Sequence, residues 1–461
     1  MIIMEMNENV EMITGDPKKA INKLAWPLIA SMLLIFLNNI IDSIWVAGLG
    51  PDPLAAIGYV TPLFMVLVGF GNGIGAGATS LISRYIGAEK RDDANNAAIH
   101  SAILSIVVSA VLTVIALLIL ESLLKIMGAS SVLNYAMDYG VIIFAFTAPI
   151  LIPPIFGGAF RAEGDIKRAT LPIAIVAVIN MILDPIFIYV FGWGISGAAF
   201  ATGLAPCFGL LMMLYWIFIK KDTYLSLNRK DFHNNLNMYK DILSVGIPAS
   251  LEQLIMAALA VTVNYMLTLV SGSVAVAVYT AGWRLISLGL LPAIGVGTAA
   301  ITVSGVAYGA KKYENIRTAL RYSVKLGLIS SIVVCILLFV FANQLAYIFS
   351  YSEASAPLLP LIASFIQLMC LFILYVPFGA SAGNVFQGLG KGTTSFILTT
   401  FREFVLVLIF AYLFGFVFNM GENGIYYGML LGGFLGSVIA YGYIEIYVDR
   451  LIKGKIKGSN I

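Results

Sequence analysis

The apolar stretch LLIFLNNIIDSIWVAGL, residues 33–49, places an acid in the middle of a hydrophobic segment of membrane length. The acid is Asp42, and a second one, Asp184, lies in a similar run, Leu171–Val190. A spanning helix needs about 20 predominantly apolar residues, so both runs predict membrane helices. A charge at bilayer depth costs at least about 2.5 kcal/mol, and it usually faces a partner, a cavity or a transported ion. The two acids therefore indicate where the chemistry of this chain lies.

The composition of the 461 residues is that of a membrane protein. Hydrophobic residues make up 60% of the chain and charged residues 11%, and the mean hydropathy is +0.94. Soluble domains contain about 25% charged residues. We therefore predict an all-α polytopic membrane protein. The twelve predicted transmembrane helices lie at residues 20–48, 54–86, 95–120, 132–160, 168–191, 196–220, 241–270, 274–308, 316–345, 357–387, 394–418 and 424–449.

The basic residues predict the orientation of these helices. With both termini in the cytoplasm, the 27 Lys and Arg residues all fall at the cytoplasmic face except Lys125, which lies outside, and Arg284, which lies in a span. This distribution follows the positive-inside rule. We expect a multi-pass protein of the cell membrane with cytoplasmic N- and C-termini.

The longest polar segment, in the middle of the chain, divides it into two halves. Each half has six predicted helices, so both halves begin on the same side of the membrane and the repeat is parallel. The predicted parts are a cytoplasmic N-terminal segment 1–19, an N-lobe 20–220, a cytoplasmic linker 221–240, a C-lobe 241–450 and a cytoplasmic C-terminal tail 451–461.

The two halves also share sequence features. Trp26–Pro27 corresponds to Ile247–Pro248, and a shift of 222 residues superposes Gly73 on Gly295. Glycines at every second position of residues 69–77 predict close helix packing or a bending point. The resulting expectation is a pair of pseudo-symmetric six-helix lobes.

The polar neighbours of the two acids follow helical spacing. Asn38 and Trp45 lie four residues before and three residues after Asp42, so the three share a helix face. Asn180 lies four residues before Asp184 in the same way. Pro185 lacks an N–H, which frees the carbonyl of the residue four positions earlier. Both acids therefore have potential oxygen or amide partners on their own helices.

These groups form an all-oxygen set, to which Thr202 in the sixth predicted helix adds a hydroxyl. Such a set suits a hard cation or a shared proton rather than a soft metal. Two nearby acids in a low dielectric do not both ionise unpaired, so one should keep its proton. The alternative is that each acid makes only its own interhelical hydrogen bond. The predicted cation site, for Na⁺ or H⁺, comprises Asp42, Asn180, Asp184 and Thr202. The predicted substrate cavity includes Asn38, Trp45 and Met181. The predicted hinges are Pro27 and Pro185.

The second half offers fewer candidates. We expect Glu252 to be a solvated acid near a helix end, and Arg284 either to pair with it or to reach a headgroup or substrate. Residues 354–401 contain no acid, which argues against a cation site in the C-lobe. Gly379–Gly383 matches the nucleophile-elbow pattern around Ser381, but the serine lies in a predicted helix. The sequence has no ATPase or zinc-protease motif, so we predict a transporter driven by an ion gradient and not an enzyme.

Several motifs resemble those of one known family over nearly the whole chain. They are Trp26–Pro27, Asp42–Gly48 (Asp-Ser-Ile-Trp-Val-Ala-Gly), the glycine pattern of Gly75–Ala88, and Phe160–Gly164 (Phe-Arg-Ala-Glu-Gly). In combination the chain resembles multidrug and toxic compound extrusion (MATE) transporters, and among these the prokaryotic branch similar to DNA-damage-inducible protein F.

The resemblance implies a V-shaped pair of lobes that exports organic, often cationic, compounds against entry of Na⁺ or H⁺. In that branch the coupling site uses an Asp of helix 1, an Asn and an Asp of helix 5 and a Thr of helix 6, which match Asp42, Asn180, Asp184 and Thr202. No cofactor other than the coupling ion is implied, nor any nucleic acid, and we expect a monomer in the lipid bilayer. The alternative function is a lipid or lipid-linked saccharide flippase of the same superfamily, which the scarcity of intramembrane basic residues opposes.

Overall fold

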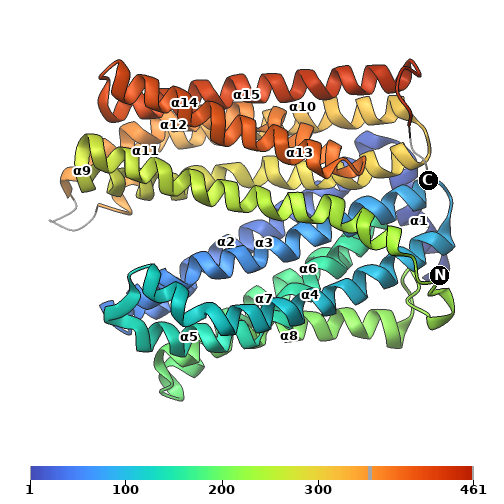
Figure 1. Cartoon of the computed structure of the whole chain (residues 1–461), viewed down its shortest axis with the longest axis horizontal. Helices are drawn as coiled ribbons and strands as arrows, with labels where there is room; N and C mark the ends of the chain where they lie inside the picture. Colours follow the sequence, from blue (N-terminus) through green and yellow to red (C-terminus); the bar gives the residue numbers. More distant parts are fainter. Residues whose placement is uncertain (1, 351–355, 459–461) are drawn as a thin grey trace. The chain divides into compact units, whose positions relative to one another are not determined.

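The computed structural model describes residues 2–350 and 356–458, and every regular element in these ranges is helical (Figure 1). In chain order the elements are α1 (Ile2–Thr14), α2 (Pro17–Ala47), α3 (Pro51–Gly87), α4 (Arg91–Ile126), η1 (Ala129–Val132), α5 (Leu133–Ala145), α6 (Thr147–Ala162), α7 (Ile166–Pro185), η2 (Ile186–Val190), α8 (Gly194–Leu214), η3 (Tyr215–Lys220), η4 (Arg229–Asp231), α9 (Leu236–Gly309), α10 (Tyr313–Val340), α11 (Ala342–Tyr347), η5 (Ala356–Leu358), α12 (Leu359–Gly388), α13 (Gly392–Thr399), η6 (Thr400–Leu406), α14 (Val407–Tyr412), η7 (Leu413–Val417) and α15 (Gly421–Ile452).

The helices long and apolar enough to cross a membrane agree with the predicted number of spans. Within the described ranges ten such helices occur, and one of them is the 74-residue α9. Gly272 interrupts α9 with a positive φ of 74°, so α9 supplies two spans. A further span comes from α5 and α6, which are bent by 46° at their junction. The ten helices, the second half of α9 and the bent pair together confirm twelve spans in an all-α membrane fold.

The described residues form two compact units. Unit 1 contains residues 2–15 and 30–250, and unit 2 contains residues 16–29 and 251–458. Helix α2 therefore begins in unit 2 and continues in unit 1, whereas α9 begins in unit 1 and continues in unit 2. Each change falls three residues after an equivalent proline, Pro27 or Pro248. The predicted lobe limits at residues 20–220 and 241–450 stay a prediction.

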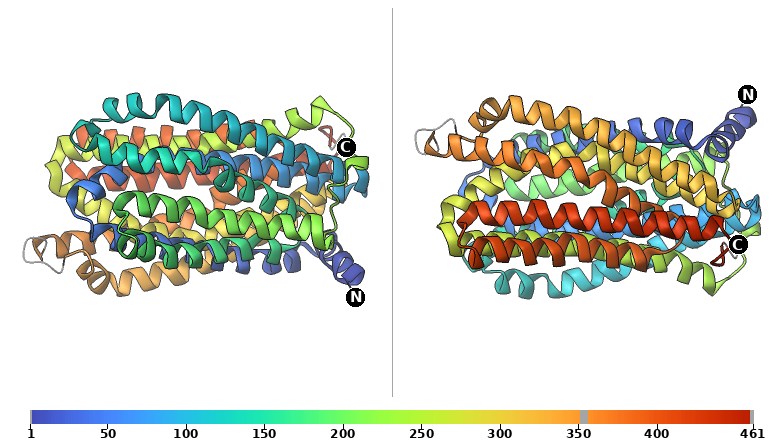
Figure 2. Two further views of the ribbon diagram at one scale, coloured as in Figure 1. Left: turned by 90° about the horizontal axis from the view of Figure 1, so that it is seen from below. Right: turned by 90° about the horizontal axis from the view of Figure 1, so that it is seen from above.

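In unit 1 the glycines of α3 allow two neighbouring helices to approach closely. Gly75 faces the backbone of α6, and a Cβ atom there would meet the carbonyl of Pro154. Gly73, on the other side of α3, faces Gly246 and Ser250 in the first part of α9. The predicted packing role of these glycines is thus confirmed, and α3, α4 and α6 pack against one another (Figure 2).

Unit 2 shows the same arrangement: its glycine-containing helix packs against the first helix of the other repeat. Gly295 of α9 faces Ile29 of α2, as Gly73 faces Ser250 in unit 1. The amide of Asn22 also donates to the Tyr322 hydroxyl, at 2.6 Å, which fixes the start of α2 against α10. The matching contacts show that the repeat predicted from sequence extends to the way the helices pack.

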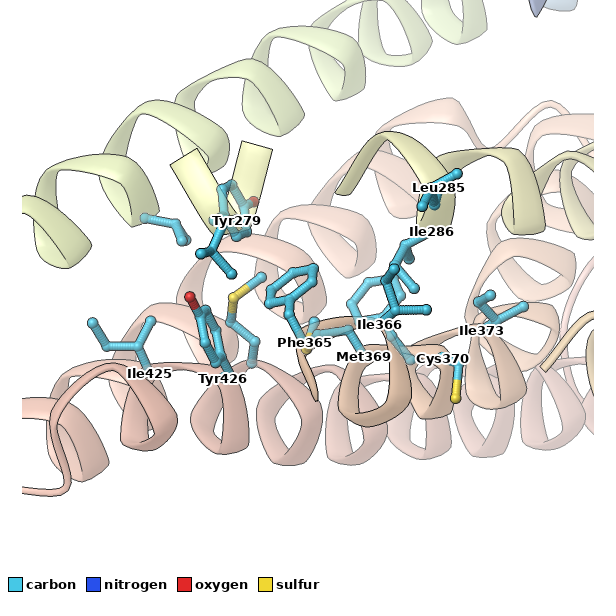
Figure 3. Packing of buried hydrophobic residues seen from close by; sticks show 14 of the residues in the cluster. Tyr279, Leu285, Ile286, Phe365, Ile366, Met369, Cys370, Ile373, Ile425 and Tyr426 are labelled. Carbon is cyan, nitrogen blue, oxygen red and sulfur yellow. The ribbon is translucent and has the colours of Figure 1, made fainter. Parts of the chain in front are cut away.

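The core of unit 2 combines aliphatic side chains with aromatic rings in edge-to-face contact (Figure 3). The ring of Phe365 lies 4.9 Å from that of Tyr426 and 5.8 Å from that of Tyr279, centroid to centroid. Gly282 leaves the space that the Phe365 ring occupies. Edge-to-face pairs contribute about 0.5–1.5 kcal/mol each beyond their burial, so this core holds α9, α12 and α15 in one arrangement.

Helix α15 packs on η6 and α14 through glycines four residues apart. Gly428 lies against Ala411, Gly432 against Leu406, and Gly436 against the backbone and side chain of Arg402. Gly442, on the same helix, has open space where a Cβ would be added. The two glycines Gly436 and Gly442 therefore form a natural pair for testing the packing.

The linker, residues 221–235, is held against unit 1 by a buried acid. Glu163 follows α6, is 1% exposed, and accepts a hydrogen bond from the Leu225 N–H at 2.8 Å. Burial raises the pKa of Glu163 from 4.5 to about 8; the hydrogen bond and the charges of Arg168 and Arg91 oppose this rise, and Asp165 adds to it. Glu163 is thus largely protonated in the folded protein at neutral pH.

We predict that Gly436→Ala destabilises the protein and that Gly442→Ala does not. The added methyl group at residue 436 overlaps the Arg402 backbone, and overpacking of this kind typically costs about 1–3 kcal/mol. At residue 442 the same change removes only the flexibility of glycine, which favours the helix by about 1 kcal/mol or less. Thermal unfolding of both variants in detergent measures the difference, and equal midpoints would contradict the packing at Gly436.

We also predict a pH dependence of stability that originates at Glu163. Because its pKa is raised above the ordinary 4.5 to about 8 in the folded protein, its contribution to stability is complete below pH 4.5 and is lost as the pH rises through 8. Glu163→Gln mimics the protonated side chain at every pH. The unfolding midpoint of this variant, relative to wild type, should therefore rise between pH 5 and pH 9. The exposed Glu89→Gln serves as control, and a constant difference for Glu163→Gln would contradict the prediction.

Candidate functional site

The two acids predicted from sequence meet in unit 1. Asp42 of α2 and Asp184 of α7 have side chains within hydrogen-bonding reach of each other. Asp184 is completely buried and Asp42 is partly buried. One oxygen of each, Oδ1 of Asp42 and Oδ2 of Asp184, is buried without a partner among the described protein atoms. The pair therefore concentrates two acids and two available oxygens between two membrane helices.

Asn180 connects α2 to this pair. Its Oδ1 accepts a hydrogen bond from Asn38 Nδ2 at 2.9 Å, and its Nδ2 donates to Asp184 Oδ1 at 3.2 Å. The i,i+4 spacing of Asn180 and Asp184 on α7 makes this second bond possible. Asn38 Oδ1 is a third buried oxygen without a partner among the described atoms. A single amide thus positions both the acid on its own helix and the amide on α2.

Thr202 of α8 joins the site through a residue that the sequence did not indicate. Its side chain shares a hydrogen bond with the hydroxyl of Tyr139, on α5. Tyr139 is 7% exposed and lies close enough to Asp42 and Asp184 to be affected by their charges. The local sequence of Tyr139 contains no motif that distinguishes it from the other 21 tyrosines.

The outer part of α2 is attached to the segment that follows Pro185. The Tyr189 hydroxyl, in the π-helix η2, donates to the carbonyl oxygen of Trp45 at 2.5 Å. The two rings also lie edge to face, 6.2 Å apart. Gly48 provides the space for this hydroxyl, because a Cβ there would overlap it. The assignment of Asn38, Trp45 and Met181 to a substrate cavity, and of Pro27 and Pro185 to hinges, stays a prediction.

The donor set of the acid pair fits a hard cation or a proton. Its atoms are carboxyl and amide oxygens, which prefer Na⁺-like hard ions, and the three oxygens without a partner could all accept. Within the described residues no group of three or more His, Cys, Asp or Glu side chains is close enough to hold a metal ion. This cluster of two acids therefore does not resemble a transition-metal centre.

Unit 2 contains a second polar cluster, which corrects the expectation for Glu252 and contradicts one of the two alternatives for Arg284, a pair with Glu252. Glu252 is not a solvated acid: it accepts a hydrogen bond from Ser395 Oγ at 2.7 Å and is approached by Gln387 Nε2 at 3.4 Å. Arg284 is exposed and takes no part in these bonds. The reason is the position of Glu252, which points toward α12 and α13 rather than toward the end of its own helix.

The sequence did not indicate the buried ion pair that lies beside this cluster. Arg402 and Glu403 lie in η6, inside the span Gly392–Val417, so Arg284 is not the one basic residue in a span. Arg402 Nη2 is 2.8 Å from Glu403 Oε1, and the two side chains are 7% and 3% exposed. Gly379 leaves room for the guanidinium group, and Gly436 leaves room for the backbone and the aliphatic part of Arg402. Arg402 and Glu403 lie near the start of a predicted span, so the sequence did not indicate that both charges face the protein interior.

The nucleophile-elbow pattern has a packing explanation. Ser381 is 1% exposed within the helix α12. Gly379 lies against Arg402, and Gly383 lies against Ser395 and Thr399. The two glycines of the pattern are therefore contact points between α12 and the α13–η6 segment.

Comparisons with known proteins agree with this architecture. The family model MatE matches twice, at residues 27–186 and 248–413, so its two matches begin at the equivalent prolines. A curated relative from Staphylococcus haemolyticus, "Multidrug export protein MepA", is 26% identical over 437 residues, 92% of this chain and 93% of the relative. A protein from Shewanella oneidensis named "FAD transporter" is 25% identical over 351 residues, 75% of this chain and 77% of the relative.

A solved structure described as the outward-facing conformation of a multidrug resistance MATE family transporter of the MOP superfamily has a TM-score of 0.94 and 37% identity. The similarity covers 96% of this chain and 99% of that one. The fold is thus that of MATE transporters, in two lobes. Because the two family matches together cover more than half of the residues, this chain belongs to the MatE family, the multidrug and toxic compound extrusion transporters that its motifs resemble.

Proposed function

We propose that this chain is a secondary active multidrug antiporter that exports organic, often cationic, compounds in exchange for H⁺ or Na⁺. The name of the MepA relative, a multidrug export protein, supports the direction and the substrate class. The family membership supports transport as such. The coupling ion would enter at Asp42 and Asp184, with Asn180 and Thr202 completing the site.

The observation that carries this proposal is the contact between the two acids. Asp42 and Asp184 lie within hydrogen-bonding reach of each other, and one buried oxygen of each has no hydrogen-bond donor among the described atoms. Two full negative charges so close together in a low dielectric repel strongly. A proton or a bound cation between them removes the repulsion. The pair is therefore suited to holding one positive charge and to losing it.

An ion bound between Asp42 and Asp184 would change the forces that act on α2. A shared ion joins α2 to α7, in addition to the Asn38–Asn180 and Tyr189–Trp45 hydrogen bonds. Loss of the ion restores the repulsion at Asp42 while the other two contacts remain. We propose that α2 then bends near Pro27 and changes the substrate cavity beside Asn38, Trp45 and Met181. Transport is driven only if the ion binds one of the two conformations more tightly than the other.

The substrate itself is chosen by side chains outside the acid pair. Aromatic and methionine side chains adapt to varied apolar molecules, which agrees with a multidrug cavity. The relative named as an FAD transporter shows that a similar chain carries an anionic flavin nucleotide as its named substrate. Transport assays should therefore include FAD beside cationic dyes.

The location follows from the spans and the charge distribution. We propose a multi-pass protein of the cell membrane, with both termini in the cytoplasm and the linker on the same side. The support is the excess of Lys and Arg in the segments that this orientation makes cytoplasmic. A monomer contains the whole proposed ion site, because all of its residues belong to unit 1.

We predict that Asp42→Asn and Asp184→Asn each abolish ion-driven efflux and leave the protein folded. The amide keeps the size of the carboxyl group and one acceptor oxygen, but it replaces the other oxygen by an NH₂ donor and cannot release a proton or neutralise a cation. Efflux of a fluorescent cation from vesicles measures the first effect, and the unfolding temperature measures the second. Asp138→Asn is the matched control, since Asp138 is exposed and adjoins Tyr139 on α5. Normal efflux by both variants would exclude the acid pair as the coupling site.

The coupling ion can be assigned in liposomes loaded with substrate. A Na⁺ jump at constant pH and a pH jump without Na⁺ are applied separately to the reconstituted protein. Release by one of the jumps in wild type, and by neither in Asp184→Asn, would identify the ion and its site together. Release by neither jump in wild type would contradict ion coupling.

A further inference from the structure

The linker is bound to unit 1 through its main chain. Near its start, Arg91 Nη2 donates to the carbonyl oxygen of Tyr224 at 2.8 Å, and its guanidinium group lies over the Tyr224 ring. Asn95 Oδ1 accepts from the Ser226 N–H at 2.9 Å. Both Arg91 and Asn95 belong to the first turns of α4. Arg91 thus holds both the main chain and the ring of Tyr224, whereas Asn95 holds the main chain of Ser226.

The end of the linker is held by the next turn of α4. Asn96 donates from Nδ2 to the His233 carbonyl oxygen at 2.9 Å and accepts from the His233 N–H at Oδ1, at 3.1 Å. One amide therefore satisfies both main-chain groups of one residue. Two residues later, the Asn235 N–H lies 3.1 Å from Nε2 of His100. Helix α9 begins at the following residue, Leu236.

The contacts of His100 allow one protonation state. Its Nδ1 lies 2.8 Å from the carbonyl oxygen of Asn96, and a carbonyl can only accept, so Nδ1 carries a hydrogen. Its Nε2 faces the Asn235 N–H, which can only donate, so Nε2 carries the lone pair. The imidazole is completely buried. His100 must therefore be neutral, with its hydrogen on Nδ1, for the linker to be bound as seen.

None of the contacts that the structure shows for the ring supplies a negative charge. From α9 the ring of Tyr239 lies 4.5 Å away, from the linker that of Phe232 lies 5.3 Å away, and from α4 the contact is the Asn96 carbonyl. Tyr239 is the one titratable group in these contacts, and none of them supplies a carboxylate. A proton on Nε2 would face the Asn235 N–H, and a buried cation without a counter-ion is strongly disfavoured.

We propose that residues 222–235 form a strap across the end of unit 1 and that His100 is its pH-sensitive clasp. Protonation of His100 breaks the bond to Asn235 and frees the strap near the start of α9. The contacts of Arg91 and Asn95 do not involve His100, and Glu163, which accepts from the Leu225 N–H, gains a proton rather than loses one as the pH falls, so the first part of the strap stays bound. This device is separate from the acid pair that binds the coupling ion.

The contact between His100 and Asn235 fixes the start of α9, the helix that continues into unit 2. Residues 236–250 of α9 pack in unit 1, where Gly246 and Ser250 lie against Gly73 of α3. This close packing depends on the position of the first turn of α9. Acidification on the side of the linker would therefore loosen the first turns of α9 without protonating the ion site.

The test is the mobility of a nitroxide spin label at position 234. Asn234 is exposed and lies between the two residues that Asn96 and His100 hold. The full-length protein carries Asn234→Cys in a background with Cys207, Cys335 and Cys370 changed to serine, and is reconstituted in nanodiscs. The control label is Asp92→Cys, at an exposed position of α4 outside the strap. Room-temperature spectra are recorded from pH 7.5 to pH 5.

We expect the label at position 234 to become more mobile as the pH falls and the label at position 92 to stay unchanged. In His100→Gln, whose amide oxygen can still accept from Asn235 but cannot be protonated, the label should stay immobile at every pH. In His100→Ala it should be mobile already at pH 7.5. An immobile wild-type label down to pH 5, the same pH response in His100→Gln, or an immobile label in His100→Ala would each overturn the proposal.

Discussion

The hydrocarbon core of a membrane offers no hydrogen-bonding partner, so every polar side chain placed there must be satisfied by another part of the protein. This constraint explains the arrangement of both buried clusters. In unit 1, Asn180 satisfies Asp184 on its own helix and Asn38 on α2, which ties the two helices together. In unit 2, Arg402 Nη2 pairs with Glu403 Oε1, and Ser395 and Gln387 approach Glu252. The first cluster has two acids and no base, whereas the second includes its own cation. That difference suits the first to an exchangeable ion and the second to a permanent structure.

Close approach of helices is the means by which these partners are brought into reach. Association of helices in a membrane depends on van der Waals packing and on interhelical hydrogen bonds rather than on the hydrophobic effect. The glycines of α3 and α15 remove the side chains that would separate the backbones. Gly379 additionally makes room for the guanidinium group of Arg402, and Gly436 makes room for the aliphatic part of the same side chain.

The sequence predicted those parts of the structure that depend on local spacing. Asn180 and Asp184 are four residues apart, and a helix places such residues side by side, so their contact could be predicted. The lengths of the apolar runs likewise predict the membrane spans. Contacts between distant segments left no such signal. Tyr139 reaches Thr202 from another helix, Glu252 meets Ser395 about 140 residues later, and Asn96 meets His233 in the linker. Arg402 and Glu403 were missed for a different reason: a charged pair near a predicted helix end is usually solvated, and only the surrounding packing shows that it is not.

The exchange of first-helix segments between the two units has a consequence for the synthesis of the chain. Residues 16–29 leave the ribosome first but pack with residues made much later, after position 250, whereas unit 1 is incomplete until residues 236–250 have been added. Contacts so far apart in sequence form slowly, because a long loop must close before they contribute. Neither half of the duplicated sequence is therefore a complete folding unit. The glycine-containing helix of each repeat is covered by the first helix of the other, so the two repeats depend on each other within one polypeptide.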